Sequence, residues 1–273
     1  MKQNKIALLV LSSIIPLFAN ATASQPVAPE VATAKTEKPL LTGKHSMIVT
    51  NNPWASKAAQ QMLDKGGNAT DAAIAAAFVL GLTEPQSSGI GGGGYALSYH
   101  AQTKQLLAFD GREVAPLSAT AEWFIDPKTS KPINFESAML SPLSVGVPGE
   151  VALFYKMHQQ NGKLAWNKLL TPAITLARNG FPMSPRLYGL LQSDQDILKH
   201  NPQVAKVYFN AQGEVKPIGD KVSNIAYADT LQIIAKNPQE FYTGKIAQDI
   251  VDAVNKSAHQ KLMSAKDLSA YKV

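Results

Sequence analysis

Residues 66–94 constrain the fold of this 273-residue chain more than any other segment, with the sequence GGNATDAAIAAAFVLGLTEPQSSGIGGGG. The segment joins an alanine-rich helix to four consecutive glycines, Gly91 to Gly94. Small side chains let backbones approach closely, and glycine loses more conformational freedom on ordering than any other residue. The segment is therefore poorly suited to ordinary surface, and it predicts tight packing or backbone access nearby.

Capping signals predict the helices on either side of this segment. Asn52 followed by a proline predicts one helix N-terminus, and Gly66-Gly67 predicts its end. Asn68 or Thr70 should cap a second helix, from residue 71 to about residue 82, that is apolar on nearly every side and therefore buried. Five later helices are expected at 149–160, 171–180, 227–236, 244–256 and 264–271.

The expected strands precede most of these helices. A short buried strand is predicted at 45–50, and an antiparallel hairpin is predicted from 95–100 and 105–110. The order of one strand, two helices, a hairpin and then many helices indicates an α+β fold with a layered sheet. It does not fit alternating βαβ units.

The first 44 residues predict export. Lys2 and Lys5 precede an apolar run that is too short to span a bilayer as a mature helix, and small-x-small cleavage sites follow it. We therefore expect a cleaved signal peptide and no stable membrane anchor. Because exported proteins usually carry disulfides and this chain has no cysteine, a bacterial periplasm is favoured. The expected parts are a signal peptide (1–23), a flexible linker (24–44) and a folded portion (45–273).

Several common kinds of site do not fit the sequence. Gly89 to Gly94 satisfies GxGxxG, but a helix precedes it and a strand follows, which reverses the order that pyrophosphate binding requires. The five histidines lack metal-ligand spacing, so we expect no metal and no cofactor. No GxSxG occurs, and Ser87 and Ser88 fit a turn better than a nucleophile. The net charge of +6 includes no basic run interleaved with aromatics, which argues against nucleic acid as a partner.

Arg112 is the candidate site residue, since it follows the second hairpin strand in the sequence Asp110-Gly111-Arg112-Glu113. Loops at strand ends often carry ligand contacts, and the planar guanidinium group matches a carboxylate. Alternatively, Arg112 only pairs with Asp110, Glu113 or another acid. The residues alone leave both interpretations open.

Residues 66–97 resemble the signature segment of the γ-glutamyltranspeptidase family, and DGREVAP at 110–116 resembles its Arg-Glu-x-Ala-Pro element. Shorter similarities follow in the family's order: Val147-Pro148-Gly149, Asn179-Gly180-Phe181, Phe241-Tyr242-x-Gly244 and Asp267-Leu268-x-x-Tyr271. The resemblance extends over about residues 45–273. It implies an N-terminal-nucleophile hydrolase fold, a layered αββα sandwich with two antiparallel sheets between helical layers, of which this chain holds only the large-subunit part.

The resemblance also implies an activity, which is cleavage of the γ-glutamyl bond of glutathione with transfer to water, amino acids or peptides. Family members cleave themselves into two subunits, and the attacking threonine begins the small subunit, with its own α-amine as base. Arg112 matches the large-subunit arginine that binds the substrate α-carboxylate. None of Thr70, Thr120 and Thr171 matches the nucleophile's motif, so we expect no catalytic residue here and no turnover by this chain alone.

The partners implied by the resemblance are glutathione or other γ-glutamyl compounds and the small subunit of the same precursor. Strands of that subunit should complete both sheets, so the isolated chain is expected to aggregate. Two other functions stay open. A cephalosporin-type acylase resembles the same family, although Arg112 mildly favours a substrate with a free α-carboxylate. A non-catalytic secreted remnant is the other.

Overall fold

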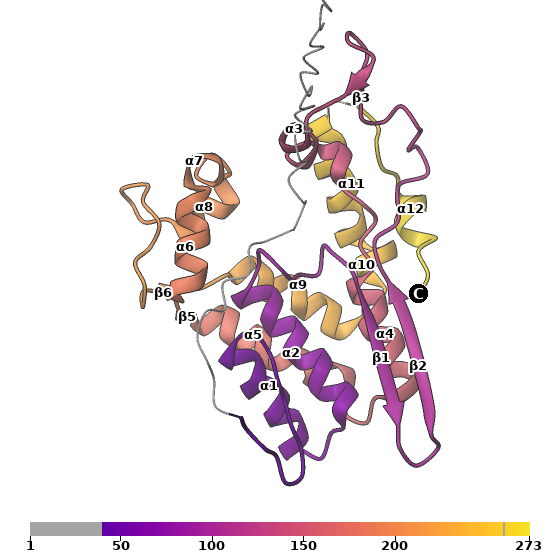
Figure 1. Cartoon of the computed structure of the whole chain (residues 1–273), viewed down its shortest axis with the longest axis vertical. Coiled ribbons are helices and arrows are strands. Elements are labelled where there is room, and N and C mark those ends of the chain that lie inside the picture. The colour runs from indigo at the N-terminus through magenta and orange to yellow at the C-terminus, as the bar shows by residue number, and fades with distance from the viewer. Residues whose placement is uncertain (1–39, 259) are drawn as a thin grey trace, which may run out of the picture. The chain divides into compact units, whose positions relative to one another are not determined.

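The computed structural model describes residues 40–258 and 260–273 (Figure 1). Its helices are α1 (Pro53–Asp64), α2 (Ala69–Thr83), α3 (Phe135–Met139), α4 (Glu150–Asn161), α5 (Trp166–Asn179), α6 (Pro185–Ser193), α7 (Gln195–Leu198), α8 (Pro202–Tyr208), α9 (Ile225–Lys236), α10 (Glu240–Thr243), α11 (Lys245–Ala258) and α12 (Ala265–Ser269), with a 3-10 turn η1 (Pro142–Ser144). Its strands are β1 (Gly94–His100), β2 (Gln105–Gly111), β3 (Ile125–Asp126), β4 (Lys131–Pro132), β5 (Phe181–Pro182) and β6 (Lys221–Val222).

The expected signal peptide, 1–23, lies outside the described residues, and so does the expected linker up to residue 39. The end of that linker, 40–44, is exposed and has no regular structure. In the described part of the chain, no helix combines the length and the apolar character needed to cross a membrane.

The first two helices begin where the sequence predicts. Asn52 caps α1 by accepting a hydrogen bond from the N–H of Trp54 at 3.0 Å. Asn68, one of the two predicted caps, begins α2 and forms a reciprocal capping box with Asp71. Between the helices Gly66 adopts φ +82°, a left-handed conformation that favours glycine. These local signals therefore fix the ends of the helix that leads to the glycine run.

α2 belongs to the main hydrophobic core and contacts α1, α4 and α5 (Figure 1). Most of its residues are buried, as its apolar sequence predicts. Its alanines let neighbouring helices approach, and Phe78 fills the space between them. The Phe78 ring makes edge-to-face contacts with Phe154 of α4 and Trp166 of α5, at 5.3 and 5.9 Å between ring centroids. This packing holds the end of α2 from which the glycine-rich segment continues.

β1 and β2 form the expected antiparallel hairpin, in which Gly94 lies opposite Gly111. One face packs on α4, where Phe109 is buried. The other face exposes a stripe of large apolar side chains, each at least 62% exposed: Tyr95, Leu97, Tyr99 and Leu106. Among the described residues, the β3–β4 and β5–β6 ladders are only two residues long. The α+β class is confirmed, and these residues contribute a hairpin with one covered face to the expected layered sandwich.

Residues 181–222 pack on the rest of the chain through a second hydrophobic cluster. The cluster combines side chains of α6, α8 and the β5–β6 ladder with Leu82 of α2, Ala177 of α5 and Ala228 of α9. Gly180 ends α5 as predicted and turns the chain into β5 at φ +82°. The segment is therefore attached beside the C-terminal end of α2.

The strand predicted at 45–50 is wrong. Met47 and Val49 are 53% and 86% exposed, and no described residue pairs with this segment in a ladder. An apolar run becomes a strand only where a neighbouring strand satisfies its backbone N–H and C=O groups. That requirement is not visible in a local pattern.

The helix start predicted at Thr171 is also wrong, because α5 begins at Trp166 and Pro172 lies inside the helix. An internal proline costs about 3 kcal/mol. Burial of Trp166, Leu169 and Leu170 in the core offsets that cost, since each large apolar side chain contributes about 1.5–3 kcal/mol when buried. Tertiary packing here overrides the local proline signal.

We predict that Asp71→Ala lowers the free energy of unfolding by about 3 kcal/mol or more, because hydrogen bonds to a buried charged group are each worth about 1.5–3 kcal/mol. The fully buried Asp71 carboxylate accepts from the N–H groups of Asn68, Lys163 and Leu164 at 3.0–3.2 Å. Urea denaturation at low micromolar protein concentration measures the loss.

The matched control is Asp229→Ala, which removes the acid of an exposed ion pair with Arg178. We expect the control to cost at most about 1 kcal/mol. Equal effects of the two substitutions would contradict a structural role for the Asp71 network.

Candidate functional site

A cleft of about 430 Å³ lies where the segment after α2, the end of β2 and the start of α4 meet. Its lining residues are Pro85, Ser87, Ser88, Gly89, Gly91, Gly92, Gly93, Arg112, Glu113 and Glu150. The cleft thus combines backbone of the glycine run with three charged side chains. It includes the candidate residue from the sequence, Arg112.

The glycine run allows the backbone to pack closely beneath this cleft. A Cβ atom on Gly93 would overlap with the carbonyl oxygen of Gly111, whereas one on Gly91 would meet open space. The carbonyl oxygen of Gly92 accepts hydrogen bonds from the N–H groups of Gly149 and Glu150, at 2.9 and 3.0 Å. The expectation of close packing is therefore confirmed at Gly93, and the run also anchors the start of α4.

Arg112 has a fixed backbone and a partly open side chain. Its N–H donates to Asp110 Oδ1 at 3.1 Å, and its carbonyl oxygen accepts from the Tyr271 hydroxyl at 2.7 Å. The guanidinium Nε lies 3.3 Å from Glu113 Oε2, and the side chain is 53% exposed. Within 40–258 and 260–273, no acceptor contacts its two terminal amino groups. The Arg112 guanidinium group therefore pairs with Glu113 through Nε and keeps its two terminal amino groups available to a carboxylate.

Two stacked tyrosines support the cleft from the C-terminal part of the chain. The rings of Tyr242 and Tyr271 lie 5.8 Å apart at 13°. The Tyr242 hydroxyl donates to the carbonyl oxygen of Pro148 and accepts from the N–H of Ala152, both at 3.0 Å. Since Tyr271 holds the Arg112 carbonyl, residues more than a hundred positions apart fix the backbone around one guanidinium group.

Glu150 gives the cleft an ionisable group near neutral pH. Burial raises the pKa of its carboxyl group to about 7; the negative charge of Glu113 adds to the increase, and Arg112 opposes it. Tyr227, Tyr242 and Tyr271 also interact electrostatically with Glu150, and burial raises the pKa of each phenol, which keeps all three neutral. The charge state of the cleft near pH 7 therefore depends on Glu150.

Neither Glu113 nor Glu150 was predicted from the sequence as a site residue. A detectable signal was the position of Glu150, an acid in the first helical turn directly after Val147-Pro148-Gly149. Ser87 lines the cleft, and its N–H donates to the carbonyl oxygen of Glu84 at 3.0 Å, which agrees with the predicted turn.

The family model described as gamma-glutamyltranspeptidase matches residues 55–273. Among curated relatives, the glutathione hydrolase proenzyme of Bacillus subtilis (strain 168) is 37% identical over 232 residues, which are 85% of this chain and 39% of the relative. The proenzyme of the same name from Escherichia coli (strain K12) is 33% identical over 255 residues, 92% of this chain and 43% of the relative. The chain thus spans about two fifths of the length of these relatives.

Solved structures with the same fold include Helicobacter pylori γ-glutamyltranspeptidase, with a TM-score of 0.80 and 31% identity over 86% of this chain and 66% of that one. Cephalosporin acylase from Bacillus halodurans gives a TM-score of 0.68 and 27% identity over 89% of this chain and 46% of that one. The expected N-terminal-nucleophile hydrolase fold is confirmed by these likenesses. Because the family model covers most of its length, this chain belongs to the γ-glutamyltranspeptidase family and represents the N-terminal, large-subunit portion.

Proposed function

We propose that the cleft binds the glutamyl end of γ-glutamyl compounds, and that the complete protein, this chain together with its small subunit, cleaves the γ-glutamyl bond of glutathione. The glutamyl group then passes to water, amino acids or peptides. The observation that carries the proposal is the Arg112 guanidinium, which lines a 430 Å³ cleft with its two terminal amino groups open. The Bacillus subtilis and Escherichia coli relatives are named glutathione hydrolase proenzymes, which supports the choice of substrate.

The contacts of Arg112 suit recognition of a carboxylate. Its Nε pairs with Glu113, which restrains the plane of the guanidinium group. A substrate α-carboxylate can then accept parallel hydrogen bonds from the terminal amino groups, and such bidentate pairs combine strength with a defined orientation. In this proposal Arg112 fixes the glutamyl end so that the γ-carbonyl carbon projects toward the attacking threonine.

The uncovered face of the β1–β2 hairpin indicates that the chain has a protein partner. The apolar stripe of Tyr95, Leu97, Tyr99 and Leu106 is a contiguous exposed surface of a kind that soluble monomers seldom present. The small subunit of the same precursor would cover it and bring the threonine nucleophile to the cleft. A periplasmic location accompanies this proposal, since the basic and apolar start of the sequence is typical of export.

A cephalosporin-type acylase is the second candidate function, and the structural likeness to the Bacillus halodurans enzyme favours it. The two functions differ in what occupies the Arg112 end of the cleft. A γ-glutamyl substrate carries both an α-carboxylate and an α-amine there, whereas a glutaryl group has the carboxylate alone. Comparing hydrolysis of glutathione and glutaryl-cephalosporin by the complete protein separates them.

For the isolated chain we predict no turnover. Purified 1–273 incubated with γ-glutamyl-p-nitroanilide should release no p-nitroaniline above background, because the proposed nucleophile belongs to the small subunit. Release above background, or an internal cleavage that exposes a new N-terminal threonine, would contradict the assignment of the nucleophile.

Arg112→Lys in the complete protein should weaken apparent affinity for glutathione about 10- to 150-fold, which corresponds to about 1.5–3 kcal/mol for a bidentate, charge-assisted contact. Lysine keeps the charge but presents a single ammonium group. Steady-state kinetics with glutathione measures the change. Arg178→Lys is the matched control, because Arg178 pairs with Asp229 on the surface. An unchanged affinity of the Arg112→Lys variant would mean that Arg112 pairs with Glu113 and does not bind the substrate.

The raised pKa of Glu150, about 7, predicts a pH-dependent affinity for carboxylates. Below this pKa Glu150 is neutral, and above it a second negative charge faces any carboxylate bound to Arg112. Competitive inhibition by glutarate, which carries no amine, should therefore weaken about fivefold from pH 6 to pH 8. About 1.4 kcal/mol of partly screened repulsion makes a roughly tenfold difference between the neutral and ionised forms, and Glu150 is only partly converted over this pH range. Glu150→Gln should abolish this dependence, and an equal slope in both proteins would show that another group titrates.

A further inference from the structure

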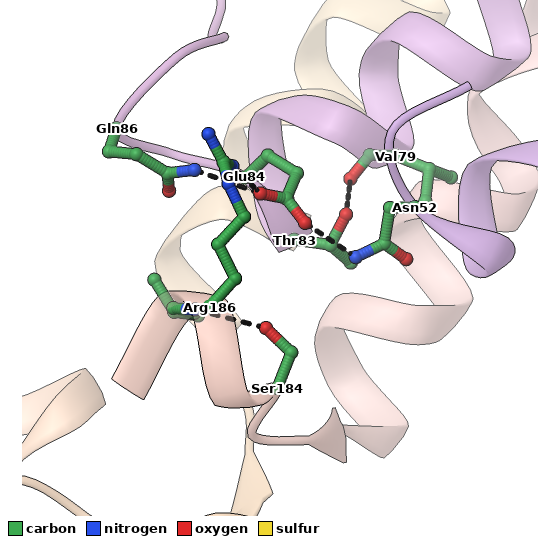
Figure 2. Close-up of polar contacts among 8 residues, drawn as sticks. Asn52, Val79, Thr83, Glu84, Gln86, Ser184 and Arg186 are labelled. Carbon is green, nitrogen blue, oxygen red and sulfur yellow. Dashed lines mark hydrogen bonds and ion pairs between the residues drawn. The ribbon is translucent and has the colours of Figure 1, made fainter. Parts of the chain in front are cut away.

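A buried carboxylate outside the cleft joins three helices. Glu84, the C-terminal cap of α2, is 3% exposed. Its Oε1 accepts a hydrogen bond from Asn52 Nδ2 at 2.8 Å, and its Oε2 accepts from Gln86 Nε2 at 2.8 Å and from Arg186 Nη1 (Figure 2). Asn52 caps α1, and Arg186 lies in the first turn of α6. One side chain therefore links the start of α1, the end of α2 and the start of α6.

A buried ion pair is weak evidence for stability by itself, because desolvation of the two charges offsets their attraction. Breaking such a pair is nevertheless unfavourable, since the remaining charge stays buried without its partner. The arrangement therefore acts as a geometric constraint: the end of α2 and the start of α6 keep the separation that lets Arg186 reach Glu84. Figure 2 shows the Arg186 side chain extending from α6 toward the Glu84 carboxylate.

Residues 85–93, which directly follow Glu84, form one side of the cleft and are called the wall below. Residues 85–93 include seven of the cleft-lining residues, and Gln86, the second residue of the segment, bonds directly to Glu84. Midway, Gly89 packs against α2: a Cβ atom on Gly81 would lie 3.1 Å from the Gly89 Cα. At the far end, the carbonyl oxygen of Gly92 is bound by the first amides of α4. The Glu84 network fixes the proximal end of this wall, and α4 fixes the distal end.

Arg186 belongs to the segment 181–222, whose side chains form the second hydrophobic cluster with Leu82. The Ser184 hydroxyl caps α6 by accepting from the N–H of Leu187 at 3.1 Å, and Leu187 is buried in that cluster. The backbone at Arg186 is thus held by packing that does not involve the cleft. Through the side chain of Arg186, the segment 181–222 contacts Glu84, the residue that directly precedes the wall.

We infer that Arg186 and Glu84 are positioning residues for the cleft: they hold 85–93 in the conformation that, under the proposed function, receives the glutamyl group opposite Arg112. Neither residue lines the cleft, so they act through the backbone of the wall. The expected change in KM for glutathione rests on the proposed function. The expected change in hydrogen exchange of the wall does not.

The test uses Arg186→Met in the complete protein, which keeps an unbranched apolar stem like that of arginine and removes the guanidinium group with its charge. Hydrogen exchange of the amides in 87–93 should accelerate about tenfold or more, as expected when local opening becomes easier. KM for glutathione should rise about tenfold while kcat changes less than about twofold, because uniform substrate binding is lost without loss of the reacting groups. Arg186→Lys, which still reaches Glu84 with a charge, should recover most of the wild-type KM.

Two controls separate positioning from general loss of stability. Leu191→Ala removes a buried side chain of α6 in the second cluster without touching Glu84, and it should lower the thermal midpoint while leaving KM unchanged. If Arg186→Met does not fold, the double variant Glu84→Gln/Arg186→Met, which leaves no unpaired buried charge, should fold and still show fast exchange in 87–93.

The outcomes are distinct. Unchanged exchange in 87–93 for Arg186→Met, or for the double variant, overturns the inference, and so does a rise in KM for Leu191→Ala equal to that for Arg186→Met. If the wild-type complete protein does not act on γ-glutamyl substrates, the proposed function fails. The exchange data then still decide whether Arg186 and Glu84 order the wall.

Discussion

The cleft depends on how closely three stretches of backbone approach one another. The carbonyl oxygen of Gly92 accepts from the first two amides at the start of α4, and the absence of side chains at Gly93 and Gly149 leaves room for the Gly111 carbonyl oxygen between them. Helix N-terminal amides need acceptors, and the glycine run supplies one from the protein itself. Any larger residue at Gly93 would move the end of β2, and with it Arg112, away from the glycine-rich wall.

Within that frame the cleft contains one guanidinium group, one carboxylate paired with it and one carboxyl group that titrates near neutral pH. The pairing of Arg112 with Glu113 through Nε leaves the other edge of the guanidinium plane open. Glu150 then sets whether the cleft is neutral or carries a net negative charge. Binding of an anionic ligand therefore depends on whether Glu150 is protonated, as well as on the shape of the cleft.

Much of the fold was predictable because its signals are local. Asn52, Asn68, Gly66 and Gly180 each act within a few residues, and the hairpin follows from two adjacent apolar runs. Arg112 was predictable from its motif, but the contacts that give it a defined environment were not, since Tyr271 is 159 positions away in sequence. The same limit applies to Arg186, which is 102 positions from Glu84, and to residues 45–50, whose apolar run finds no pairing strand among the described residues.

Gly91 lines the cleft, and it differs from its neighbours in the run because a side chain placed there would project into open space. The sequence contains no cysteine. A thiol introduced at Gly91 would therefore be unique in this chain, and a small fluorophore attached to it would lie in the cleft that Arg112 also lines. Gly93 has no room for a side chain, whereas Gly91, two residues earlier in the same run, is a natural attachment point for an optical reporter of occupancy.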